Sequence, residues 1–223
     1  MPVLKPRTRA SSAATAKRGR PPLDHDERKR ILDATTKVFL ERGFRRASTS
    51  EIARRAHTSK QTLYALFPTK AVLFVGVMSA HTDQLFARHD FFIASGSSPR
   101  KTLTEIGHLV LDKFSTPEFL ALYRIVVGEA HEFPDLARQL WRECMVRGYG
   151  LLAEYLQSRR IGGPRYNKSA TQFVSFVLGD FILNSVLNPD RRTSKRALQA
   201  RVQQAVDDFL RLHSGGRALK ERL

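Results

Sequence analysis

A run of four donor side chains, Ser59-Lys60-Gln61-Thr62, has the chemistry to contact a polyanion and the edges of bases. Hydroxyl, ammonium and amide groups all donate hydrogen bonds, and the amide of Gln61 has the paired donor and acceptor that can read adenine bidentately. The residues that follow place Leu63, Leu66 and Phe67 at helical spacing. The pattern predicts a helix that opens with polar groups facing outward and buries its other face.

Two short helices joined by a tight turn are expected to position this run. The first should span 49–56, because Ser48 and Glu51 have the three-residue spacing of a capping box. The second should span 60–67, with Ser59 as its N-cap. Helices of about eight residues are marginal alone, so the pair is typical of a helix-turn-helix, whose second helix enters the major groove.

Longer helices are expected on both sides of this motif. One begins near Asp24 and is closed by Gly43, which can adopt a left-handed C-cap. Another is capped by Thr69 and should reach about Phe92. Further on, breakers rich in Gly, Pro and Ser separate segments of about 15 to 27 residues without the alternation of strands. The whole chain is therefore predicted to be all-α.

The charge favours a polyanionic partner. The 223-residue chain has a formal charge of +17, and residues 1–70 alone hold 17 Lys and Arg against six Asp and Glu. One cysteine, Cys144, excludes an internal disulfide framework and fits a reducing compartment. No apolar run approaches the roughly 18 residues of a membrane span, and residues 1–16 lack the apolar core of a signal peptide. We expect a soluble, cytoplasmic protein without a membrane partner.

Residues 1–23 are expected to form a basic, disordered arm, because residues 1–20 carry six cations, no acids and few large apolar side chains. Its core, Arg18-Gly19-Arg20-Pro21, looks like an AT-hook, in which arginines enter the narrow minor groove of A-T-rich DNA. The alternative is a solvated tail that attracts phosphates without reading groove shape. Both interpretations stay open.

The segment 28–74 resembles the tetracycline-repressor (TetR) family of bacterial transcription regulators. The residues that carry the resemblance are Ile31, Ala34, Phe39, Gly43-Phe44, Ile52-Ala53, Ser59, Thr62-Leu63-Tyr64, Phe67 and Lys70. It implies that Ser59 to Thr62 face DNA, that Tyr64 touches a phosphate and that Lys70 sits on the DNA backbone at a helix N-terminus. The predicted DNA-binding set is Arg18, Arg20, Ser48, Thr49, Ser59, Lys60, Gln61, Thr62, Tyr64 and Lys70.

The motif departs from the family pattern at two places. His57-Thr58 stands where the turn usually has Gly-Val, although His tolerates a left-handed backbone. Thr49 stands where the family often has a more apolar residue. These departures leave open how the recognition helix is oriented on DNA and which operator sequence it reads. Arg54 and Arg55 are equally compatible with a solvated face and with phosphate contacts.

The resemblance implies that residues 75–213 form a bundle of five or six helices that binds a small molecule and dimerises, followed by a tail at 214–223. Residues 173–187 are apolar at ten of fifteen positions, nearly all round the helix, and the last helix has an apolar stripe. These two helices can form a four-helix dimer interface suited to a palindromic operator. The predicted interface residues are Phe173, Phe176, Val177, Phe181, Leu198, Val202, Val206 and Phe209.

The middle helices offer aromatic and polar candidates for an effector cavity, although each could simply be a core residue. The predicted effector-binding set is Phe86, His108, Phe114, Tyr123, His131 and Trp141. His108 and His131 are not supported as a metal pair by any ligand-like spacing, and Cys144 fits a buried small hydrophobe better than a redox sensor. No metal or cofactor is expected.

Two functions remain as hypotheses. The first is a ligand-responsive transcriptional regulator, most often a repressor in this family, in which the effector moves the two recognition helices through the fourth helix. The second is an architectural DNA-binding protein without a small-molecule input. An enzyme is not expected, because the sequence has no phosphate-binding Gly loop, zinc-type spacing or nucleophile motif.

Overall fold

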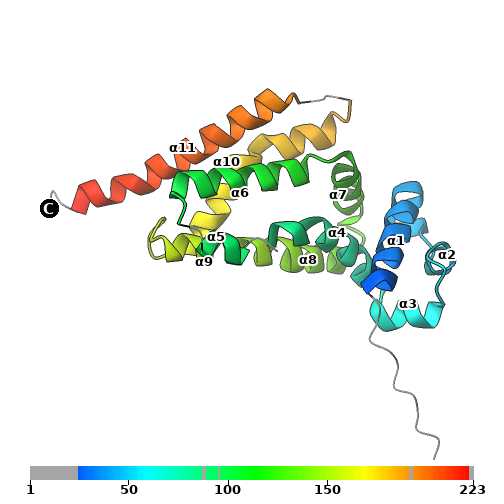
Figure 1. Ribbon diagram of the computed structural model, residues 1–223. Coiled ribbons are helices and arrows are strands. Elements are labelled where there is room, and N and C mark those ends of the chain that lie inside the picture. The colour runs from blue at the N-terminus through cyan, green and yellow to red at the C-terminus, as the bar shows by residue number, and fades with distance from the viewer. Residues whose placement is uncertain (1–24, 87–88, 95, 191–192, 221–223) are drawn as a thin grey trace, which may run out of the picture.

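The computed structural model describes residues 25–86, 89–94, 96–190 and 193–220, and every regular element among them is a helix (Figure 1). This confirms the prediction of an all-α chain. The helices are α1 (His25–Arg46), α2 (Thr49–Arg55), α3 (Lys60–Leu66), α4 (Lys70–Phe86), α5 (His89–Ala94), α6 (Pro99–Phe114), α7 (Pro117–Glu129), α8 (Pro134–Leu140), the π-helical turn η1 (Trp141–Val146), α9 (Arg147–Ser158), α10 (Tyr166–Leu187) and α11 (Lys195–Lys220).

Helices α1, α2 and α3 form a small body at one end of the molecule, and α4 leads from it into the larger bundle (Figure 1). The small body closes around Ile31, Phe39, Ile52 and Leu63, which are all fully buried. Gly43 has a φ of 72°, so it interrupts the helix where the sequence predicted a left-handed C-cap. Burial of these apolar side chains stabilises helices that would be marginal alone.

Two of the three predicted N-caps are present. The Ser59 hydroxyl accepts from the Thr62 amide at 3.0 Å, and the Thr69 hydroxyl accepts from the Val72 amide at 3.1 Å. The predicted capping box at Ser48 is wrong, because the Ser48 side chain makes no cap hydrogen bond. In a capping box the Glu51 side chain would reach back to the start of α2, but the Glu51 carboxylate pairs with Arg55 instead.

The helix that follows Thr69 is described from Lys70 to Phe86, and Phe92, the expected end of this helix, lies in α5 (His89–Ala94). Residues 87 and 88 lie outside the described residues.

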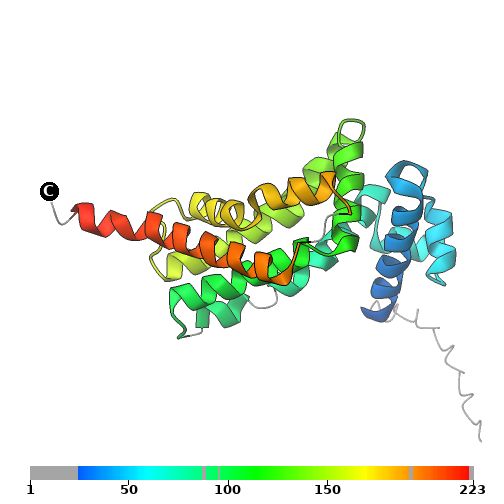
Figure 2. The same ribbon diagram turned by 90° about the horizontal axis from the view of Figure 1, so that it is seen from above.

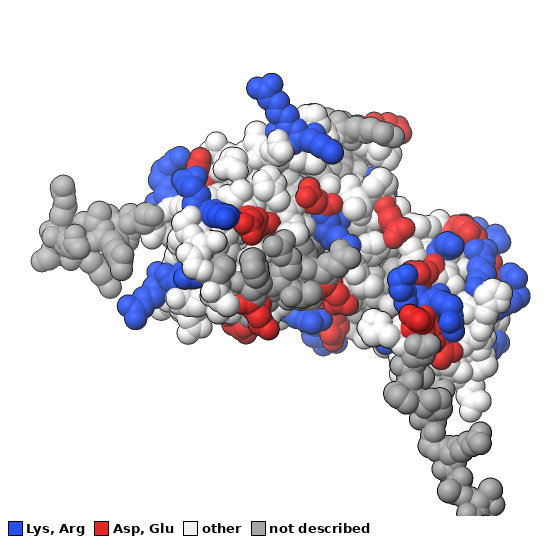
Figure 3. All heavy atoms as spheres, viewed as in Figure 1, with Lys and Arg blue, Asp and Glu red and all other residues white. Residues whose placement is uncertain are grey.

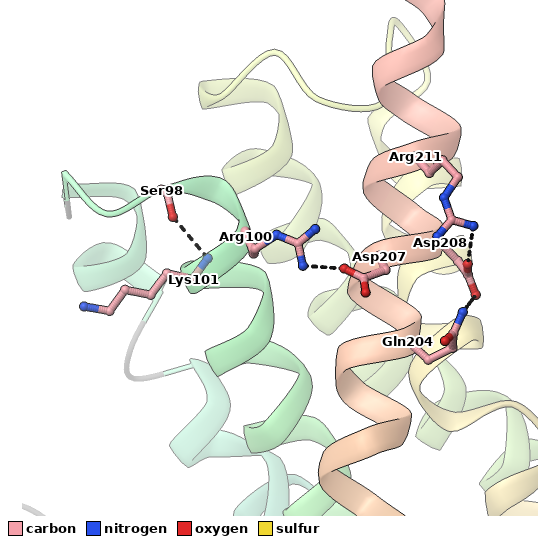
Figure 4. A network of polar contacts seen from close by, with 7 residues as sticks. All are labelled: Ser98, Arg100, Lys101, Gln204, Asp207, Asp208 and Arg211. Carbon is pink, nitrogen blue, oxygen red and sulfur yellow. Dashed lines mark hydrogen bonds and ion pairs between the residues drawn. The ribbon is translucent and has the colours of Figure 1, made fainter.

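The bundle is held together by a second core between α6, α9, α10 and α11. Helix α11 runs along the bundle (Figure 2) and approaches α6 closely, because Gly107 leaves room for the side chain of Val202. A Cβ at Gly107 would lie only 2.8 Å from Cγ1 of Val202. At the surface of the same contact Arg100 of α6 pairs with Asp207 of α11 (Figure 4).

Helix α10 has a kink at Gly179, whose φ is 38°. Arg201 of α11 donates to the freed carbonyls of Val177 and Leu178, both at 3.4 Å, and pairs with Asp180. By length and composition α10 could cross a membrane, with a mean hydropathy of 1.4, which differs from the expectation that no segment qualifies. It packs against α6, α9 and α11, as a core helix of the bundle does.

Candidate nucleic-acid interface and effector cavity

The recognition helix α3 presents its polar start to solvent. Ser59, Lys60 and Gln61 are exposed and Thr62 is half-buried. On the opposite face Leu63 is fully buried, so the helix lies with its apolar side in the core of the small body, where it packs on α2. This two-sided arrangement is the one that the sequence predicted, and it leaves the first turn of α3 open to a major groove.

Thr49 and Tyr64 form a hydrogen bond between the two helices of the motif. The Thr49 hydroxyl and the Tyr64 phenol oxygen are 2.9 Å apart, and the Tyr64 side chain is 44% exposed. The bond fixes the phenol at the N-terminal end of α2, next to the exposed Ser48. Three of the predicted DNA-contacting residues therefore lie on one surface, where helix N-terminal amides favour an anion.

Lys70 lies mostly inside the domain. Its ammonium donates to the carbonyls of Arg45 at 3.0 Å and of Ala47 at 3.3 Å, and it sits 4.8 Å from the ring centroid of Phe44. Burial lowers the pKa of Lys70. An ammonium has three donors, so these bonds leave at most one for a DNA phosphate. Lys70 therefore joins the start of α4 to the backbone at the C-terminal end of α1.

Arg55 holds α1 and α2 together rather than facing outward. Its guanidinium binds both carboxylate oxygens of Glu41 at 2.7 Å and one of Glu51 at 2.5 Å. The hydrogen bond from Arg55 lowers the pKa of Glu41, and the same contact raises the pKa of Arg55. Arg54 is exposed. Of the two arginines, only Arg54 keeps an orientation open to phosphate.

Positive charge gathers around the small body in the space-filling view (Figure 3). Acidic side chains lie among the cations there. In this body Glu41 and Glu51 both pair with Arg55. The arm residues Arg18 and Arg20 lie outside the described residues.

Two hollows open side by side within the bundle. The α9 hollow, of about 90 Å³, lies between α4, α6, α9 and α10 and is lined by Thr82, Phe92, Ile106, Leu109, Val110, Phe114, Cys144, Met145, Gly148, Tyr149, Leu151, Leu152, Tyr155 and Val174. The α7 hollow, of about 240 Å³, lies between α4, α7, α8 and η1 and is lined by Met78, Thr82, Phe119, Tyr123, Val126, Val127, Ala130, Ala137, Leu140, Trp141, Cys144 and Met145. Thr82, Cys144 and Met145 belong to both.

Three of the six predicted effector residues line these hollows. Phe114 lines the α9 hollow, and Tyr123 and Trp141 line the α7 hollow. His108 is half-buried on α6 and His131 is exposed in the turn after α7, and neither lines one of these two hollows. A histidine near an apolar stripe can face away from it, and the sequence does not show which.

The remaining predicted residue, Phe86, ends α4, and its side chain lies outside the described part of the structure. Sequence reasoning missed Tyr149 and Tyr155 of α9, which both line the α9 hollow. The available signal was that both are aromatic residues in one amphipathic helix of the bundle. Among the described residues no group of three or more His, Cys, Asp and Glu side chains is placed to hold a metal ion.

The predicted dimer residues lie mostly inside the chain. Six of them are buried without any partner subunit, each at most 7% exposed, namely Phe173, Val177, Phe181, Val202, Val206 and Phe209. Phe176 and Leu198 are partly buried against the same core. The six therefore belong to the core of a single chain, and their assignment to a subunit contact is corrected. On the outer side of α10, Leu183 and Leu187 are 62% and 67% exposed.

The chain resembles known proteins along both parts. Residues 31–77 match the "Bacterial regulatory proteins, tetR family" domain, and residues 101–214 match the "AefR-like transcriptional repressor, C-terminal domain". The transcriptional regulator YdeS of Bacillus subtilis is 41% identical over 180 residues, which cover 78% of this chain and 85% of YdeS.

Solved structures agree with this assignment. A TetR-family regulator from Mesorhizobium loti has the same fold, with a TM-score of 0.73 and 22% identity over 85% of this chain and 98% of that one. The flavonoid-responsive regulator FrrA superposes with a TM-score of 0.64 and 27% identity over 83% of this chain and 96% of its own. With a helix-turn-helix at one end and a matching bundle behind it, this chain belongs to the TetR family of transcriptional regulators.

Proposed function

We propose that this ligand-responsive regulator represses transcription by binding a palindromic operator as a homodimer, and that a small organic molecule in the hollows releases it. The observation that carries the proposal is the course of α4. Only three residues separate this helix from α3, and its later residues Met78 and Thr82 line the hollows. One rigid element thus joins the DNA-contacting surface to the candidate ligand site.

The joint between the two parts is well packed. Phe44, at the end of α1, contacts Phe74 of α4 and Phe133 of the turn before α8, with centroid distances of 5.7 and 5.0 Å. Arg45 also pairs with Glu132 across the same joint. Because packed cores shift between discrete arrangements, a ligand that displaces α4 or α7 would turn the small body as a unit.

A homodimer would pair two recognition helices with successive major grooves, about 34 to 36 Å apart. The outer side of α10 and the neighbouring part of α11 offer the surface for this contact, since Leu183 and Leu187 are exposed there. A two-fold contact makes the same patch serve on both copies, which matches a palindrome.

The test is a titration of the full chain against DNA from upstream of its own gene and against a scrambled duplex, at two salt concentrations. A sequence-specific regulator should bind the first duplex at least about a hundredfold more tightly at physiological salt. Lys60→Ala should weaken this binding, whereas Lys101→Ala, which removes an exposed lysine in the first turn of α6, should not. Equal affinity for both duplexes would instead favour an architectural DNA-binding protein.

A further inference from the structure

We infer that the effector is an elongated, uncharged and mainly apolar molecule that occupies both hollows and places a hydrogen-bonding group at Tyr155. This inference rests on the proposed function, because it describes the ligand of the same site. It goes further in assigning the charge, shape and orientation of that ligand.

The absence of charge in the ligand follows from the lining. None of the described residues that line either hollow is an Asp, Glu, Lys, Arg or His. A buried charge is tolerated only when it is paired, and none of the lining side chains supplies a partner of either sign. Arg159, whose guanidinium lies 5.8 Å from the ring centroid of Tyr155, is not among the lining residues and donates to the Ile93 carbonyl at 3.3 Å. The nearby ion pair between Asp83 and Arg147, at 3.5 Å, involves side chains that are 58% and 55% exposed, so it belongs to the outer surface.

The position of the polar group follows from Tyr155. Its side chain is 1% exposed and lines the α9 hollow, and its hydroxyl has no hydrogen-bond partner among the described residues. Buried hydroxyl groups nearly always have a partner, because an unmade bond is costly. A hydroxyl, carbonyl or ether oxygen on the ligand would supply the missing bond.

The elongated shape follows from the wall that the hollows share. Thr82 of α4 and Cys144 and Met145 of η1 line both sides of it. Met145 has an unbranched, flexible side chain, so a rotamer change can open the wall without moving a helix. On the outer side the ring centroids of Trp141 and Tyr149 lie 6.2 Å apart. Trp141 lines the α7 hollow and Tyr149 lines the α9 hollow. A molecule that crosses this wall would contact the π-helical turn, which packs on α4.

A fluorescence titration can test the inference, because the chain contains a tryptophan beside one hollow. Trp141 is its one tryptophan and lines the α7 hollow, so its fluorescence responds directly to a molecule in that hollow. The full chain is titrated with 1-decanol and with decanoate, which share length and differ in charge, and with the shorter 1-hexanol. Decanol should change the Trp141 emission until the site is saturated, and decanoate should bind at least about tenfold more weakly. Hexanol should change the emission little, although calorimetry should detect its binding.

Tyr155→Phe removes the hydroxyl and keeps the ring, so it should lower the affinity for decanol about three- to tenfold. Tyr166→Phe, outside both hollows, is the matched control and should leave this affinity as it is. Binding of decanoate as tight as that of decanol, an unchanged affinity in Tyr155→Phe, or no binding of either alcohol would overturn the inference.

Operator binding is measured on the same samples, which separates the two proposals. If decanol binds as expected and the operator affinity does not change, release by a ligand fails while the description of the ligand site stands. If operator DNA is bound specifically and decanoate is preferred, the description of the ligand fails while the regulator function stands.

Discussion

Gly76 of α4 lies directly against the ring of Phe67, the residue that caps the C-terminal end of the recognition helix. A Cβ built at Gly76 would stand 2.8 Å from Cε1 of Phe67 and 3.2 Å from Cδ2 of Leu32. Phe67 is 1% exposed, so its ring has little room to withdraw. The contact couples the orientation of α3 to α4, the helix that also lines the hollows.

Gly76→Ala should therefore displace the recognition helix. We expect it to lower the free energy of unfolding by about 1–3 kcal/mol, as overpacking does, and to weaken operator binding even where the protein is fully folded. Thermal unfolding and operator titration measure the two effects. Gly128→Ala is the control, because a Cβ there meets nothing within 4 Å and should stabilise α7 by about 0.5–1 kcal/mol. Operator affinity equal to that of the wild type in Gly76→Ala would contradict the coupling.

The two serines at the helix starts should differ in stability. Ser59→Ala removes a side-chain cap and should cost about 1 kcal/mol of unfolding free energy in urea denaturation. Ser48→Ala should cost much less, because that side chain makes no cap bond. Equal losses in the two variants would show that the Ser48 hydroxyl does cap α2 in solution.

The hydrogen bond between Thr49 and Tyr64 should matter for DNA more than for stability. Tyr64→Phe removes the exposed phenol oxygen, so operator affinity should fall about two- to tenfold. If Tyr64 holds a phosphate, the loss should be similar on operator and non-operator DNA. Fluorescence anisotropy on both duplexes tests this, and Thr49→Val, which also breaks the bond, shows how much of the loss comes from positioning.

The arm should act through groove shape if its core behaves as an AT-hook. Replacing Arg18 and Arg20 with Ala should weaken operator binding most when the flanking sequence is A-T-rich. The measurement is the same titration with A-T-rich and G-C-rich flanks. An equal loss on both would leave only general attraction of phosphates.

His81 should make stability depend on pH. Its side chain is 15% exposed and lies 3.1 Å from Glu118 of α7, and burial lowers its pKa, partly opposed by that carboxylate. Because the folded protein then binds a proton less readily than the unfolded chain, stability should fall as the pH falls through the ordinary histidine range near 6.5. Urea denaturation from pH 7.5 to 5.5 should show a flatter dependence in His81→Gln, whereas His131→Gln, in an exposed turn, should match the wild type.

The helix-turn-helix could be predicted in detail because its signals are local. The caps at Ser59 and Thr69 and the break at Gly43 depend on residues at most a few positions apart. The cap at Ser48 failed because the acid that should complete it, Glu51, binds Arg55, which is also held by Glu41 of another helix. A local rule cannot include that competitor.

In the bundle the sequence determined that the helices are apolar on one or more sides, but the tertiary structure decided which neighbour each side meets. Phe173 and Val206 had the pattern of a subunit contact and are buried within one chain. Phe114 and Trp141 looked no different from His108 and His131, yet only the first two line hollows. The reason is physical: burial of apolar surface has no direction, so periodicity marks the side of a helix that leaves water without naming its partner. A hollow exists only where several packed helices fail to fill the space between them, and that depends on the shapes of all of them together.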